Sequence, residues 1–124
     1  MRNIEDRSFF FFFPPVSAST RRKLQASGLP FGAVTSARRA GTTTALEALE
    51  KVPQYFEMPL ISSTYWPMVH GSNAAQVAED AEGLQIMRNL GHNMAWMLRC
   101  IEAGRAAGIE PPQAETGAWT NFIR

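Results

Sequence analysis

The sequence predicts an α/β fold built around a small parallel sheet. Two short apolar runs, residues 31–36 (FGAVTS) and 58–63 (MPLISS), are bounded by turn-forming residues and are typical of buried strands. A helical pattern follows each run, and the order strand, helix, strand, helix implies parallel strands joined by a right-handed crossover. Two strands make a small sheet, so the pattern predicts one part of a larger α/β domain.

Two helices are expected. The first covers residues 42–49, and Pro53 predicts that it ends or kinks near Lys51. The second covers residues 74–107, with Ser72 or Asn73 as its cap and a broad apolar face that places Cys100 in a buried position. The apolar side chains of residues 119–123 predict that the tail docks on a surface.

Composition excludes several classes of protein. The chain has 124 residues, of which 45% are hydrophobic and 19% charged, as expected for one folded domain. A net charge of +1 is too small for a broad surface that binds a nucleic acid polymer. The single cysteine excludes an internal disulfide and favours a reducing, cytoplasmic location. The aromatic run at residues 9–13 is too short to span a membrane.

The chain is predicted to divide into an atypical N-terminal segment, residues 1–28, and a domain, residues 29–124. The first segment is expected to be poorly folded or to be the remnant of a helix. Its aromatic run is either a strand edge that the fold or a partner covers, or an exposed segment that promotes aggregation. The acidic residues Glu5 and Asp6 before the run argue against a signal peptide.

Ligands of open parallel sheets bind beyond the carboxyl ends of the strands. The loops at residues 36–43 and 64–71 follow the two predicted strands, so both are expected on that edge. Arg38 and Arg39 either hold a phosphate, brace an electron-poor ring or face water. Tyr65 and Trp66 either cap the sheet or touch a ligand. The sequence contains no recognisable catalytic triad, paired carboxylates, HExxH motif or Walker loop, so neither a catalytic residue nor a metal site is predicted.

Three stretches carry a family resemblance: AVTSARRAGTTTALEAL, MPLISSTYWPMVHG and EDAEGLQIMRNLGHNMAWMLRCIEAG. In this order they resemble the flavodoxin-like NAD(P)H-dependent FMN reductases, a family of multimeric flavodoxin-fold proteins that includes iron–sulfur flavoproteins. The resemblance covers residues 29–124 and implies a partial flavodoxin-like doubly wound parallel sheet. It makes residues 31–36 and 58–63 the last two strands, and it places the N-terminal strands, the phosphate-binding loop and any cysteine cluster before Met1.

The resemblance implies an FMN-dependent NAD(P)H oxidoreductase, a flavin or quinone reductase, as an incomplete fragment, with FMN as cofactor and NAD(P)H as co-substrate. Without the phosphate-binding loop, this chain alone is expected to bind flavin weakly or not at all. Carried over by position, the cofactor-binding candidates are Ser36, Ala37, Arg38, Arg39, Gly41 and Thr42, with Tyr65, Trp66 and His70 as weaker ones. The alternative is a non-catalytic remnant or subunit-interaction module that does not bind flavin. In either case the incomplete sheet predicts a homo-oligomer or completion by a second chain.

Overall fold

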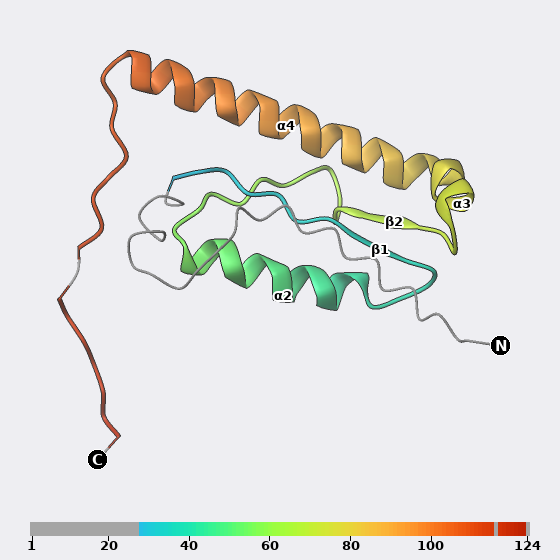
Figure 1. Cartoon of the computed structure of the whole chain (residues 1–124), viewed down its shortest axis with the longest axis horizontal. Coiled ribbons are helices and arrows are strands. Elements are labelled where there is room, and N and C mark those ends of the chain that lie inside the picture. Colours follow the sequence, from blue (N-terminus) through green and yellow to red (C-terminus); the bar gives the residue numbers. More distant parts are fainter. Residues whose placement is uncertain (1–27, 116, 124) are drawn as a thin grey trace.

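The computed structural model describes residues 28–115 and 117–123. The predictions for residues 1–27, including the aromatic run, lie outside this part of the chain. Two parallel strands lie between two long helices (Figure 1). The described elements are β1 (Thr35–Ala37), α2 (Thr42–Tyr55), β2 (Met68–His70), α3 (Ala74–Glu79) and α4 (Ala81–Ala106).

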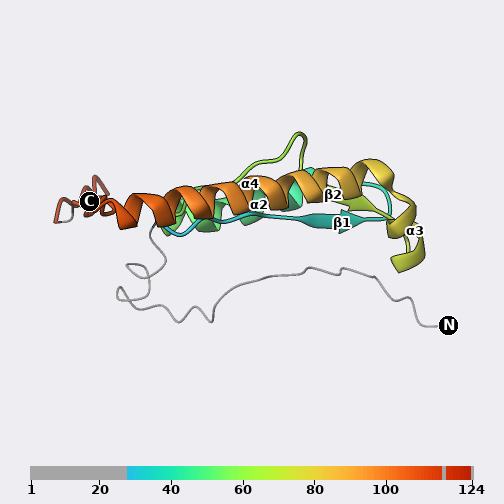
Figure 2. The same cartoon turned by 90° about the horizontal axis from the view of Figure 1, so that it is seen from above.

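The two strands pair in parallel, as predicted, although β1 begins at Thr35 and not at residue 31. Thr35 lies opposite Met68, and Ala37 lies opposite His70. Helix α2 packs against β1 and helix α4 against β2. The two helices cover opposite faces of the sheet, and from above α4 is seen to run along it (Figure 2). The described residues therefore form a three-layer α/β arrangement, consistent with part of an α/β domain.

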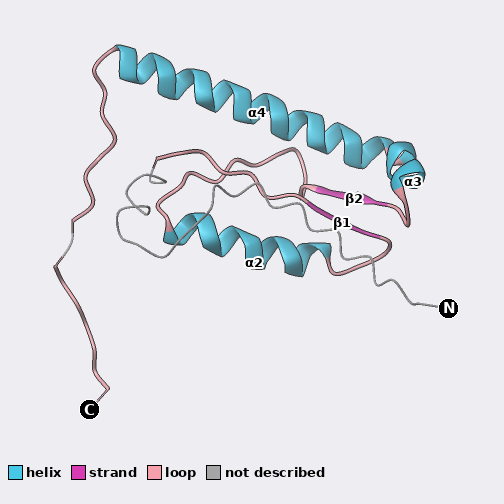
Figure 3. Ribbon diagram, viewed as in Figure 1, coloured by secondary structure: helices cyan, strands magenta, loops and turns pink. Residues whose placement is uncertain are grey.

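The second strand is not where the sequence predicted it. In residues 58–63 only Leu60 pairs, in an isolated bridge with Phe31, and the strand itself lies at Met68–His70, inside the predicted loop (Figure 3). The two pairing points, Phe31–Leu60 and Thr35–Met68, are four residues apart on one side and eight on the other. The second side therefore has four extra residues between these points, and we call the five unpaired residues 62–66 the bulge.

Helix α2 is longer than predicted because it continues through Pro53. The proline lies in the last turn, where its missing N–H removes a single helical hydrogen bond. Its ring is almost fully buried, and its carbonyl accepts hydrogen bonds from the N–H groups of Phe56 and Met58. Burial of the ring offsets the lost bond, and the helix ends two residues later at Tyr55.

The predicted second helix is two helices that meet at Asp80. Asn73 caps α3 as expected, since its side chain accepts a hydrogen bond from the Gln76 N–H at 3.0 Å. At Asp80 the backbone leaves the helical region, with φ −75° and ψ 77°, and the side chain caps α4. Aspartate is a favoured capping residue, so the chain direction changes there and not at Gly83 or Gly91.

The core is divided between the two faces of the sheet. Leu46 of α2 packs with Ala33 and Met68 on one face. Ile86 and Leu90 of α4 are buried on the other, where Leu90 and Met94 approach Gly32 so closely that a β-carbon at that position would touch both. No described helix combines the length and apolar character that crossing a membrane requires.

Two expectations about burial are wrong. Cys100 is exposed, because it lies outside the stripe of α4 that faces the sheet. The side chains of Trp119, Phe122 and Ile123 are about nine-tenths exposed, so the tail is not docked on the described part of the chain. In Figure 1 the chain after α4 runs away from the sheet.

Candidate functional site

The candidate site is the carboxyl edge of the sheet, where β1 ends at Ala37 and β2 ends at His70. These two residues lie opposite each other, and the Gly71 N–H donates to the Ala37 carbonyl oxygen at 3.3 Å. The loop of residues 38–41 leads from this edge directly into α2. We call residues 36–41 together with the first turn of α2 the rim.

The rim carries positive charge. Ser36, Arg38 and Arg39 are exposed, and no acidic residue lies in the first turn of α2. The positive end of the helix dipole adds to the charge of the two guanidinium groups. A negatively charged or electron-rich group is therefore favoured at this edge.

Gly41 leaves the start of α2 free of a side-chain cap. It has a φ of 92°, a conformation that suits glycine, and no side chain in the described part of the chain accepts hydrogen bonds from the first helical N–H groups. The first helical hydrogen bond is donated by the Ala45 N–H to the Gly41 carbonyl oxygen at 3.0 Å. The backbone N–H groups of Thr43 and Thr44 thus have no partner within the helix.

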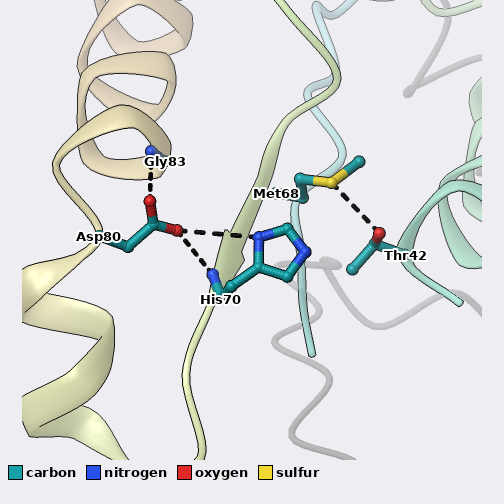
Figure 4. Close-up of polar contacts among 5 residues, drawn as sticks. All are labelled: Thr42, Met68, His70, Asp80 and Gly83. Atoms are coloured by element: carbon teal, nitrogen blue, oxygen red, sulfur yellow. Dashed lines mark hydrogen bonds and ion pairs between the residues drawn. The ribbon is translucent and has the colours of Figure 1, made fainter. Parts of the chain in front are cut away.

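Thr42 belongs to the rim, but its side chain points into the core and toward Met68 (Figure 4). It is buried, and its hydroxyl donates to the sulfur of Met68 at 3.2 Å. The Thr35 hydroxyl in turn reaches the Thr42 carbonyl oxygen at 3.5 Å. Thr42 therefore fixes the start of α2 against both strands, and only its backbone is left to face a ligand.

His70 is tied to the start of α4 through Asp80 (Figure 4). The Asp80 carboxylate accepts the Gly83 N–H at 2.9 Å and the His70 backbone N–H at 2.7 Å, and His70 Nδ1 lies 3.9 Å from the carboxylate. The hydrogen bond from Gly83, then that from His70, and the charge of His70 hold the pKa of Asp80 below its ordinary value. We call these contacts of Asp80 with His70 and Gly83 the clasp. The clasp joins β2, α3 and α4 at the candidate site.

Gly83 is required for the clasp. A β-carbon there would collide with the Asp80 carboxylate and would lie 2.9 Å from a methyl group of Val69. The first turn of α4 can therefore approach both β2 and its own cap only with glycine at this position.

We expect Asp80→Asn to lower stability at neutral pH and to flatten its dependence on pH. Because the pKa of Asp80 is lower in the folded state, its stabilising effect is present above the unfolded-state value of 3.8 and is lost as the pH falls through the folded-state value. Urea unfolding midpoints between pH 7 and pH 3 measure the difference between the variant and the wild type, which should shrink below about pH 4. Glu79→Gln, which removes an exposed neighbouring carboxylate, should leave the curve nearly unchanged. A difference that stays constant over the whole range would contradict the assignment.

The aromatic pair is not on the carboxyl edge, which corrects the prediction that both loops meet there. Tyr65 and Trp66 lie in the bulge before β2 begins, and both are more than half exposed. Among the candidates, the structure brings Ser36, Ala37, Arg38, Arg39, Gly41, Thr42 and His70 to one edge. It leaves Tyr65 and Trp66 apart from them.

Sequence reasoning missed two features of this region. The sequence predicted one continuous helix over residues 74–107, so the cap at Asp80 was missed, although aspartate is a favoured capping residue. Two of the three hydrogen bonds between the bulge and α4 come from Asn89 and Asn93, whose spacing of four residues places both amides on one side of the helix. That spacing was visible in the sequence, but the position of the bulge was not.

Comparison with known proteins adds no family assignment: no family model, curated protein or solved structure matches the chain. What is shown is the class of fold, a parallel α/β arrangement with helices on both faces of the sheet.

Proposed function

We propose that this chain is the C-terminal part of a flavodoxin-like, FMN-dependent NAD(P)H oxidoreductase and that the rim lies along the flavin ring. The proposal rests on the family resemblance together with one structural observation. The loop with Arg38 and Arg39 and the uncapped start of α2 occupy the carboxyl edge of a parallel strand pair. Open α/β sheets of this class bind their ligands at that edge.

The rim fits the polar edge of a flavin. The exposed Arg38 and Arg39 and the free N–H groups at the start of α2 are all hydrogen-bond donors. The pyrimidine edge of the ring offers acceptors and gains negative charge when the ring is reduced. In this proposal Ser36, Arg38 and Arg39 bind and orient that edge, and Ala37 and Gly41 allow the backbone to come close to it.

The bound flavin would supply the redox chemistry, by taking a hydride from the nicotinamide and passing electrons to an acceptor such as a quinone or a flavin. The residues of the rim contribute position and electrostatic stabilisation. His70 borders this edge, and its backbone is fixed by Asp80. It therefore helps to shape the edge rather than acting on the ring.

A flavin titration of the 124-residue chain tests the proposal. We expect FMN fluorescence to be quenched weakly but saturably, with circular dichroism on the same sample confirming helical structure. Riboflavin, which lacks the phosphate, should bind with similar affinity because the rim holds the ring. The absence of quenching by a folded chain, or binding of FMN without binding of riboflavin, would contradict a ring site at the rim.

The second candidate function is a non-catalytic module that packs against another subunit. It is supported by large apolar side chains that the described part of the chain leaves exposed, among them Trp96 at 59% and Trp119 at 91%. A folded chain that self-associates or binds a partner but takes up no flavin would favour this function over the first.

A further inference from the structure

The surface has a hollow that lies away from the rim and is lined by the bulge. It has a volume of about 310 Å³ and lies between α2 and the bulge, with Ala33, Leu60 and Ile61 among the apolar residues that line it. Glu50 of α2 and residues 62–67, which include Tyr65 and Trp66, also line it, whereas neither Arg38 nor Arg39 takes part. The hollow is large enough for a small organic molecule, and it is independent of the proposed flavin site.

Hydrogen bonds to α4 hold the bulge in place. The Ser63 hydroxyl donates to the Ile86 carbonyl oxygen at 2.7 Å. The Asn93 amide donates to the Ser62 carbonyl oxygen at 2.9 Å, and the Asn89 amide donates to the Thr64 hydroxyl at 3.1 Å. Three contacts to one helix therefore order the bulge just before its two aromatic residues, so little conformational entropy is lost when these residues bind a ligand.

The aromatic pair and the carboxylate favour a cation. The rings of Tyr65 and Trp66 lie 4.8 Å apart and are inclined by 59°. The faces of both ring types carry partial negative charge and attract cations. Glu50 is the one charged residue that lines the hollow among the residues that the structure describes.

The apolar lining indicates which kind of cation the hollow can bind. A metal ion needs several oxygen ligands, and a single carboxylate is too few. An ammonium group that carries methyl groups suits the site better, because its methyl groups can pack on Ala33, Leu60 and Ile61 while its charge is attracted by Glu50 and the rings.

We propose that the hollow formed by Glu50, Tyr65 and Trp66 binds a small alkylated ammonium compound, such as a trimethylammonium head group on a short chain. The bulge supplies the aromatic faces, and α2 supplies the carboxylate. This site is separate from the rim and does not depend on flavin binding.

Choline chloride is the probe, titrated into the ¹⁵N-labelled chain at constant ionic strength. The three tryptophans give three indole N–H signals, and the one that Trp66→Phe removes belongs to Trp66. We expect a saturable shift of the Trp66 signal in the millimolar range, with the signals of Trp96 and Trp119 unchanged. The neutral isostere 3,3-dimethyl-1-butanol, which has the same shape without the charge, should bind at least about fivefold more weakly.

Glu50→Gln should weaken choline binding by about two- to fivefold, since it removes the charge and keeps the shape. Glu47→Gln, at an exposed position one turn earlier on α2, is the matched control and should bind choline as the wild type does. Equal binding of choline and its neutral isostere would overturn the proposal, and this comparison needs no variant. Unchanged binding by Glu50→Gln, or a Trp66 signal that does not move, would overturn it as well.

Discussion

Leu46→Ala is expected to cost about 2–5 kcal/mol of unfolding free energy, the usual range for a buried leucine whose removal leaves a cavity. Leu46 is 2% exposed and packs with Ala33 and Met68 on the face of the sheet covered by α2. The alanine would remove the apolar contacts that hold α2 against both strands. Because the whole stability of a small domain is about 5–15 kcal/mol, this loss should be a large part of the total.

Urea unfolding followed by far-ultraviolet circular dichroism measures this effect. Glu47→Ala, at the next and exposed position of the same helix, is the control and should change the free energy by less than about 0.5 kcal/mol. A loss below about 1 kcal/mol for Leu46→Ala would mean that α2 does not pack on the strands as described.

The double substitution Arg38→Ala with Arg39→Ala is expected to weaken flavin binding about tenfold, which corresponds to about 1.4 kcal/mol. Both guanidinium groups are exposed, so water screens them and their combined contribution stays below that of buried charged hydrogen bonds. The two arginines should stabilise the reduced flavin more than the oxidised flavin, because the reduced ring carries negative charge. Flavin reduction in the variant should therefore also be slower.

The matched control is Arg99→Ala, which removes an exposed arginine from the second half of α4, far along the chain from the rim. Its guanidinium donates to the Ala95 carbonyl oxygen of its own helix, at 3.3 Å. A fluorescence titration with FMN compares the three proteins. Equal affinity and equal reduction rate in the double variant and the wild type would reject the part we assign to Arg38 and Arg39.

The alternation of apolar runs and helical patterns was enough to predict the parallel α/β arrangement, because strand and helix periodicities are local properties of the sequence. The position of β2 was not predictable in this way. Residues 58–63 have the composition of a buried strand, but Met68 pairs with Thr35 and Leu60 makes only an isolated bridge. Register depends on contacts between distant parts of the chain. In addition, Pro67 indicated a break in regular structure, so the strand that follows it was not predicted.

That shift explains why the candidate site was predicted only in part. Residues 38–42 follow β1, whose end was predicted within one residue, and together with Ser36 and Ala37 of the strand they lie on the expected edge. Tyr65 and Trp66 were placed with them because the second strand was expected to end at Ser63. Once β2 lies at Met68–His70, the same two side chains belong to the bulge, and His70 remains at the edge.

The most direct test of the proposed flavin site is a map of backbone amide signals of the ¹⁵N-labelled chain as FMN is added. We predict saturable shifts in residues 36–44, including Ser36, Arg38, Arg39, Thr43 and Thr44, while the amides of Tyr65 and Trp66 stay in place. Shifts confined to the bulge, or no shifts in residues 36–44 at millimolar FMN, would contradict the proposal that the rim lies along the flavin ring.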